Sequence, residues 1–252
     1  SLQHDGLWCT FEEQVMGNAA EFIGRQLEVT REEMDEFAFR SHQLAAKATD
    51  EGKFKAEIAP ITVKHRKSET VIDNDEPIRP ETSMELLARL RPAFEADGQV
   101  TAGNAPGLND GASAVIVASR AYAEKQGHAP VARIVGYGHA ALDPAWIFYA
   151  PVKAVPIALE KAGWTMDDVD LFEINEAFGM VTQLAMMELN LDHAKVNING
   201  GACALGHPIG CTGARIIVTL IYALKRLNKQ KGVASLCIGG GEATAIAIEN
   251  LA

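Results

Sequence analysis

Several features common in other classes of protein are absent from this sequence of 252 residues. No uncharged apolar run approaches the roughly 18 residues that a membrane-spanning helix needs, and the start lacks the basic-then-apolar pattern of a signal peptide. Positive charge is also scarce, since 23 Lys and Arg against 33 Asp and Glu give a formal net charge of −10. Surfaces that bind nucleic acid or anionic membranes carry the opposite charge balance. We therefore expect neither nucleic acid nor a membrane as a partner.

Cysteine is rare, and its spacing does not suggest a metal site. The four cysteines are Cys9, Cys203, Cys211 and Cys237, and no pair has the CxxC spacing of a zinc site. Because nothing indicates secretion, we expect reduced thiols, a cytoplasmic location and no bound metal. The chain starts at Ser1 without an initiating methionine, which indicates that it is entered partway through.

The hydrophobic pattern predicts an α/β protein whose pattern of secondary structure changes near residue 101. Before that point it predicts helices at 18–27 and 30–52, where Thr30 and Glu33 have capping-box spacing, followed by mostly irregular chain. Further strands are predicted at 112–118, 131–135, 169–174, 196–198, 233–238 and 243–249, with helices at 120–127, 155–162, 177–189 and 210–227. This alternation predicts a layered domain with helices on the faces of a mostly parallel sheet and a terminal antiparallel pair.

One histidine stands in a glycine-rich run that leads into a predicted helix. His207 lies between Gly206 and Pro208, and the helix opens with Gly210–Arg215. A histidine held before a helix start can serve as a general base. For an isolated Gly-His-Pro the commoner role is a histidine satisfied by backbone hydrogen bonds, but the whole run favours the catalytic interpretation.

Two further candidates stand at predicted strand ends. Cys237 ends an apolar strand and precedes Gly239, whose amide can donate to an oxyanion. A buried, inert cysteine is the alternative, and it is the role we expect for the other three. Asn175 also follows a strand, where its amide can hold a water or oxyanion, or can equally cap the next helix.

Taken together, the segments Asn175–Phe178, Asn197–Arg215 and Cys237–Gly241 resemble motifs of the thiolase family, in the same order. Leu90–Phe94 and Thr101–Gly111 also resemble that family. The resemblance implies an acyl-CoA acyltransferase that performs thiolysis of 3-ketoacyl-CoA or Claisen condensation of two acetyl-CoA molecules.

The same resemblance implies a thiolase-like layered α/β fold with a largely missing N-terminal half. It assigns 1–110 to an α-rich, coenzyme-A-binding loop domain, 111–130 to a remnant of the N-terminal thiolase domain, and 131–252 to the C-terminal thiolase domain. The implied partners are acyl-CoA, coenzyme A, the missing half, and further copies in a dimer or tetramer. No prosthetic group is implied, since coenzyme A thioesters are the substrates.

By resemblance, each candidate has a role. His207 matches the histidine that activates the nucleophile and polarises the thioester carbonyl, and Cys237 matches the acid/base cysteine. Asn175 matches the residue that positions an oxyanion-hole water, and the Gly239 amide matches a donor of the second oxyanion hole.

Four residues are placed near coenzyme A by the resemblance: Arg79, Ala102, Pro106 and Phe178. Arg79 matches a position that contacts the nucleotide end, although a solvated surface arginine is an equal alternative. Pro106 stands where many short-chain thiolases have serine, and Val15 where they often have histidine. Both departures bear on acyl-chain preference. Residues 143–151 are expected to wall the same pocket with aromatic side chains.

None of the four cysteines stands in a small-residue loop like the one that carries the thiolase nucleophile. Three interpretations remain open from sequence. The chain is the C-terminal part of a thiolase and inactive alone, a non-catalytic coenzyme-A-binding or scaffold module, or a relative of the decarboxylating condensing enzymes. The joint presence of His207, Asn175 and Cys237 favours the first.

Overall fold

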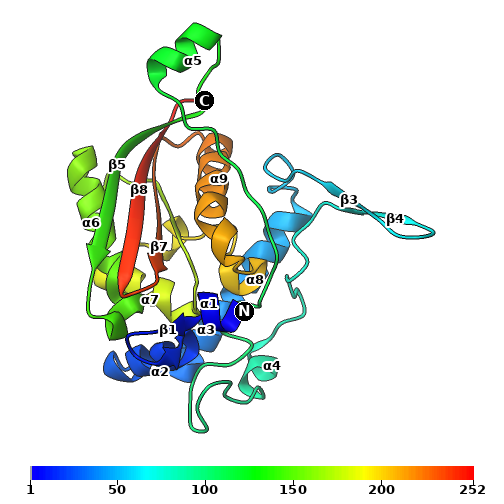
Figure 1. Cartoon of the computed structure of the whole chain (residues 1–252), viewed down its shortest axis with the longest axis vertical. Coiled ribbons are helices and arrows are strands. Elements are labelled where there is room, and N and C mark those ends of the chain that lie inside the picture. The colour runs from blue at the N-terminus through cyan, green and yellow to red at the C-terminus, as the bar shows by residue number, and fades with distance from the viewer. Residues whose placement is uncertain (1) are drawn as a thin grey trace.

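The main sheet has four strands in the order β5-β8-β7-β6, in a computed structural model that describes residues 2–252 (Figure 1). Its strands are β5 (Ala132–Ala141), β6 (Leu171–Ile174), β7 (Lys231–Ile238) and β8 (Glu242–Asn250). Helix α6 (Ala150–Ala162) packs on one face, and α9 (Ile209–Leu227) covers β6 and β7 from the other. The prediction of a layered α/β domain with helices on the sheet faces is confirmed.

The other elements lie around this sheet or outside it. They are α1 (Leu2–Gly6), β1 (Trp8–Cys9), β2 (Gln14–Val15), α2 (Met16–Gln26), α3 (Arg31–Asp50), β3 (Ile61–Lys64), β4 (Glu69–Ile72), α4 (Met84–Ala88), α5 (Arg120–Gln126), η1 (Pro144–Tyr149), α7 (Gly179–Glu188), η2 (His193–Lys195) and α8 (Ala202–Leu205). Within residues 2–252, no helix combines the length and apolarity needed to cross a membrane.

The sheet is mainly antiparallel, so the prediction of a mostly parallel sheet is wrong. Only β6 and β7 pair in parallel, whereas β5–β8 and β7–β8 are antiparallel. The reason is connectivity: a short turn at 239–241 joins β7 to β8 and forces an antiparallel pair. The long connection from β6 to β7 contains helices and allows the parallel one. The terminal antiparallel pair was correctly predicted.

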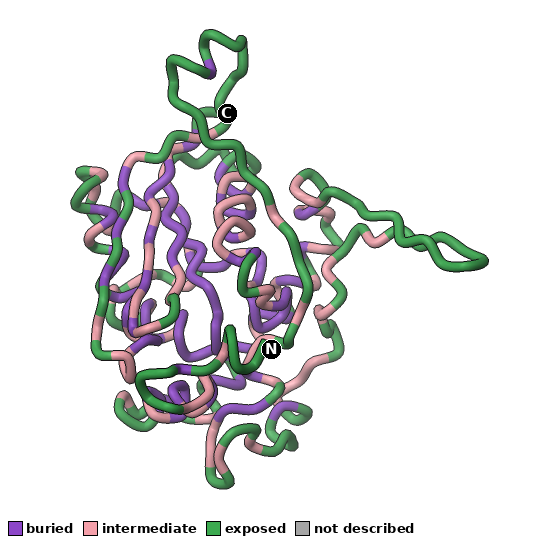
Figure 2. The backbone as a smooth tube through the Cα atoms, viewed as in Figure 1, coloured by how far each residue is buried: buried purple, intermediate pink, exposed green. Residues whose placement is uncertain are grey.

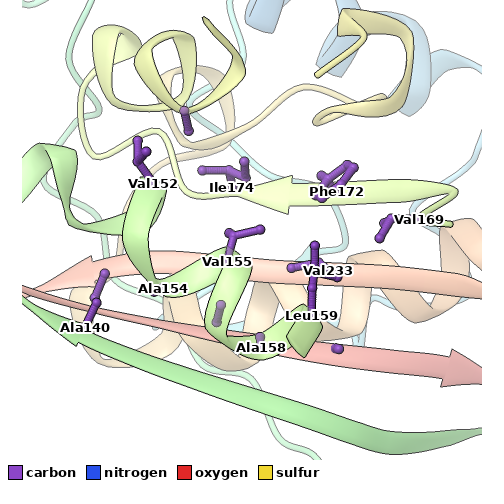
Figure 3. Close-up of a cluster of buried hydrophobic side chains, with 14 of the residues drawn as sticks. Ala140, Val152, Ala154, Val155, Ala158, Leu159, Val169, Phe172, Ile174 and Val233 are labelled. Carbon is purple, nitrogen blue, oxygen red and sulfur yellow. The ribbon is translucent and has the colours of Figure 1, made fainter. Parts of the chain in front are cut away.

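The core of this region forms where α6 meets the sheet (Figure 3). Val155 and Leu159 of α6 pack with Phe172 of β6 and Val233 of β7. On β5, Gly138 lets the helix approach closely, because a Cβ there would lie 2.1 Å from the backbone oxygen of Ala154. Close approach of helix and sheet therefore depends on a residue without a side chain at this point.

The N-terminal helices pack against one end of this layered region. Helix α3 contacts α7 and α8, while α2 contacts η1. The capping box at the start of α3 is confirmed, since Thr30 and Glu33 exchange hydrogen bonds with each other's backbone. Strands β3 and β4 form an exposed hairpin that projects from the molecule (Figures 1 and 2).

Two predicted strands do not form. Residues 112–118 were expected to be a buried strand, but they have no strand partner and run along the outside, mostly exposed (Figure 2). Ile116 is 99% exposed. Residues 196–198 make only isolated bridges, one of them between Phe172 and Val196. A strand requires a neighbouring strand with free hydrogen-bonding groups, and apolar sequence alone cannot supply one.

Candidate active site

The candidate residues meet at one end of strands β6 and β7. Asn175 directly follows β6, and its backbone N–H donates to the oxygen of Ser235 on β7 at 2.9 Å. Cys237 lies two residues further along β7. Because β6 and β7 are parallel, their carboxyl ends open at the same edge of the sheet. The strand pairing thus brings an amide and a thiol together from positions far apart in sequence.

His207 reaches this edge from the loop before α9. Its Nε2 lies 3.4 Å from Nδ2 of Asn175, and its Nδ1 lies 2.7 Å from Oγ1 of Thr212. The histidine is half-buried, and burial lowers its pKa. The ring is therefore neutral near pH 7, the form a general base needs.

Asn175 does not cap the following helix. Helix α7 begins at Gly179, and its N-cap is Phe178 without a side-chain hydrogen bond. Asn175 is instead buried with its amide toward His207, and its Oδ1 has no hydrogen-bond partner. A buried acceptor without a partner is costly unless something donates to it. Of the two roles open from sequence, the geometry favours the site.

A small cavity adjoins Asn175 behind the loop that carries His207. Its volume is about 20 Å³, and its lining includes Glu173, Asn175, Thr212 and Arg215. That volume is enough for one water molecule. Glu173 is buried, and burial raises the pKa of this carboxyl well above its usual range.

Cys237 and Gly239 share the end of β7 but differ in exposure. Cys237 is half-buried, and burial raises the pKa of its thiol to about 12. Gly239 is exposed, and a Cβ placed there would meet no atom within 4 Å. The turn closes through Gly240 and Gly241, which both have positive φ. The thiol therefore holds its proton at neutral pH, near a glycine with open space where a side chain would stand.

An aromatic cluster lies against Cys237. Phe148 and Phe178 pack edge to face with ring centroids 5.1 Å apart, and both belong to a buried cluster against which Cys237 and Trp146 pack. The expected aromatic wall from residues 143–151 is thus beside the candidate site.

The residues expected near coenzyme A fall into two places. Ala102 and Pro106 flank Asn104, which binds Asp35 of α3 through its side chain and accepts from the N–H of Gly179. This loop therefore lies against the start of α7, next to Phe178. Arg79 is exposed, and its backbone N–H donates to Nδ1 of His42. Within residues 2–252, the hydrogen bonds of the Arg79 backbone go to His42 and Thr82 and not to this loop.

The remaining cysteines lack the setting of a nucleophile. Cys9, Cys203 and Cys211 are buried and free. Burial raises the pKa of Cys203 and of Cys211, as it raises that of Cys237, so these cysteines are distinguished by their position outside the end of β7. Their predicted role in packing is consistent with these positions.

One buried carboxyl that holds the site together was missed by the sequence analysis. Glu176 accepts hydrogen bonds from Ser41 Oγ at 2.7 Å, Asn197 Nδ2 at 2.9 Å and the N–H of Cys203 at 3.0 Å. A Cβ on Gly201 would lie 2.3 Å from this carboxyl. The sequence signal was the adjacency of Glu176 to Asn175, but its partners lie too far along the chain to be read from spacing.

Comparison with known proteins assigns the whole chain to one family. Residues 1–121 match the family model "Thiolase, N-terminal domain", and residues 128–250 match "Thiolase, C-terminal domain". The acetyl-CoA acetyltransferase of Pseudomonas aeruginosa is 48% identical over 98% of this chain and 63% of its own length. That of Paracoccus denitrificans is 46% identical over 97% of this chain and 63% of its length.

A crystal structure of the Bacillus anthracis acetyl-CoA acetyltransferase superposes with a TM-score of 0.94 at 50% identity. The superposition covers 97% of this chain and 62% of the chain in that crystal structure. The chain thus spans somewhat less than two thirds of the length of these relatives. The expectation that the N-terminal domain is largely missing is wrong, because residues 1–121 match the N-terminal domain model. The chain belongs to the thiolase family.

Proposed function

We propose that this chain binds coenzyme A thioesters and handles the proton at the α-carbon of the acyl group, within a thiolase-type acyl transfer. The observation that carries the proposal is the contact of Asn175 with His207 at the end of β6, with Cys237 near the end of the paired strand β7. The acetyl-CoA acetyltransferase relatives support the same substrate class.

In the proposed step, the Cys237 thiolate takes a proton from the carbon next to the thioester carbonyl. The electron pair of that C–H bond forms the carbon–carbon double bond of the enolate, and the carbonyl π pair moves to oxygen. The N–H of the exposed Gly239 is the proposed donor to this oxygen. Asn175, beside His207, is proposed to hold a donor water for the other carbonyl. Return of the proton to carbon restores the Cys237 thiolate.

The coenzyme A moiety is proposed to lie along Ala102, Pro106 and Phe178, with Arg79 toward its phosphates. Calorimetric titration of the chain with coenzyme A tests this placement. Arg79→Ala is expected to weaken binding, whereas the matched exposed variant Arg89→Ala is not. Equal affinities of these two variants would remove Arg79 from the site.

Proton exchange at the methyl group of acetyl-CoA in D₂O tests the chemistry, and mass spectrometry measures it. We expect the parent to catalyse exchange and Cys237→Ser to lose about 10²–10⁴-fold of the rate. Because burial raises the pKa of Cys237 to about 12, the rate is expected to rise about tenfold per pH unit between pH 7 and 10. The control Cys9→Ser, at a buried cysteine outside the site, is expected to match the parent.

Coenzyme A binding without any exchange would indicate a binding module instead of a catalyst. That the chain alone does not turn over acetoacetyl-CoA stays a prediction, based on the absence of a suitably placed nucleophilic thiol among its four cysteines. Assembly into a dimer or tetramer likewise stays a prediction, and sedimentation analysis measures it.

A further inference from the structure

We infer that Thr212 is a positioning residue that fixes the proton of His207 on Nδ1 and leaves the lone pair of Nε2 directed at the reaction site. The inference concerns the same site as the proposed function and rests on it for its meaning in catalysis. The tautomer itself, however, is a property of the free chain.

The first step is the hydrogen-bond direction at Thr212. Its Oγ1 lies 3.0 Å from the backbone oxygen of Pro208, four residues earlier at the start of α9. A carbonyl oxygen accepts only, so the hydroxyl is the donor in this hydrogen bond, at an oxygen that also accepts from the backbone N–H groups of Cys211 and Thr212. The lone pairs of Oγ1 can then only accept a hydrogen bond from another group.

The second step follows at the imidazole. Nδ1 of His207 lies 2.7 Å from Oγ1 of Thr212, a distance that requires a hydrogen between the two atoms. Since the hydroxyl hydrogen is directed at Pro208, the hydrogen must come from Nδ1. In the neutral ring one nitrogen donates and the other accepts, so Nε2 carries the lone pair.

The third step is the orientation of Asn175, which agrees with this tautomer. Its Nδ2 faces Nε2 of His207 at 3.4 Å, which suits a donor facing an acceptor. In the opposite tautomer two N–H groups would face each other across this gap. The amide and the hydroxyl thus favour the same proton position from opposite sides of the ring.

A threonine hydroxyl bonded to the carbonyl four residues earlier is common in helices and by itself says nothing about function. Thr49 shows that ordinary case, with its Oγ1 2.9 Å from the oxygen of Ala45. Thr212 differs because it is almost fully buried and its remaining acceptor capacity receives the His207 proton. Thr49 is therefore the matched control.

The test is long-range ¹H–¹⁵N correlation NMR of the full chain labelled with ¹⁵N in histidine, at a pH where His207 is neutral. The His207 signals are assigned by their loss in His207→Gln. We expect the parent to show Nδ1–H with an unprotonated Nε2. A parental spectrum with the proton on Nε2 would overturn the inference without need of any variant.

Variants then test whether Thr212 determines the tautomer of His207. Thr212→Val is expected to shift the tautomer ratio toward Nε2–H by about three- to tenfold, the range of one net hydrogen bond. Thr212→Ser keeps the hydroxyl and is expected to restore the parental ratio, and Thr49→Val is expected to leave it unchanged. An unchanged ratio in Thr212→Val would refute the assigned role. No substrate is present, so this result stands apart from the exchange assay that tests the proposed function.

Discussion

Strand β7 and residues 112–118 are two short apolar runs of similar composition in very different environments. Val233 of β7 is fully buried between neighbouring strands and helices, while Val117 is 74% exposed on a segment with no strand partner. The contrast shows that an apolar run predicts a tendency to be buried in a sheet. The neighbouring strands and helices decide whether the segment is in fact buried. Four experiments test this difference.

Hydrogen exchange is expected to show the largest difference. The amides of β7 bond to β6 and β8, so their opening free energy is expected to approach that of global unfolding, about 5–15 kcal/mol. The amides of residues 112–118 lack ladder partners, and their opening free energy is expected to be near zero. Mass spectrometry of exchanged peptides measures both, and comparable protection of the two segments would refute the contrast.

A core deletion beside β7 is expected to have the next largest effect. Phe172 on β6 is 1% exposed and packs in the cluster with Val233. Phe172→Ala is expected to lower the free energy of unfolding by about 3–5 kcal/mol. The matched change Phe11→Ala, at a ring that is 70% exposed, is expected to stay within about 0.5 kcal/mol. Urea unfolding of both variants measures the difference, and a similar loss in each would contradict it.

The same substitution placed in each run gives the most direct comparison. Val233→Ala removes two buried methyl groups and is expected to cost about 2 kcal/mol, whereas Val117→Ala is expected to cost less than about 0.5 kcal/mol. Thermal melts under identical conditions rank the two. If Val117→Ala were the more destabilising, residues 112–118 would be packed in solution.

Measured per pH unit, the smallest expected effect is the titration of Glu173. The folded-state pKa of Glu173 lies well above 4.5, so between pH 4.5 and that value the folded state holds a proton that the unfolded state releases. Its contribution is therefore most favourable below pH 4.5 and declines as pH rises, by up to about 1.4 kcal/mol per unit. Glu173→Gln is expected to remove this decline. A constant stability difference between parent and variant from pH 5 to 8 would show that Glu173 does not titrate there.

The helices were the most predictable part of the fold. Helices α3, α5 and α9 follow local periodicity and local caps, so their positions could be read from short windows. Strand pairing could not, because the partner of a strand lies elsewhere in the chain. The incorrect predictions of a strand at 112–118 and of a mostly parallel sheet share this cause.

The site shows the same division. His207, Asn175 and Cys237 stand in contiguous motifs and could be proposed from sequence, but their meeting depends on the pairing of β6 with β7. Thr212 lies inside the motif Asn197–Arg215. Its contact with His207, however, depends on how the loop and the first turn of α9 fold against each other. Glu176 binds Ser41 across 135 residues, and no local pattern encodes such a distance.

The Glu176 contacts have a consequence for building chimeras from related proteins. Ser41 belongs to the segment matched by the N-terminal domain model, whereas Glu176 and Asn197 belong to the C-terminal one. A crossover between residues 121 and 128 would look neutral by family boundaries, yet it separates a buried carboxyl from one of its donors. Successful recombination at this junction therefore requires that the incoming N-terminal segment supply a hydroxyl at position 41. Otherwise, position 176 must change in the same step.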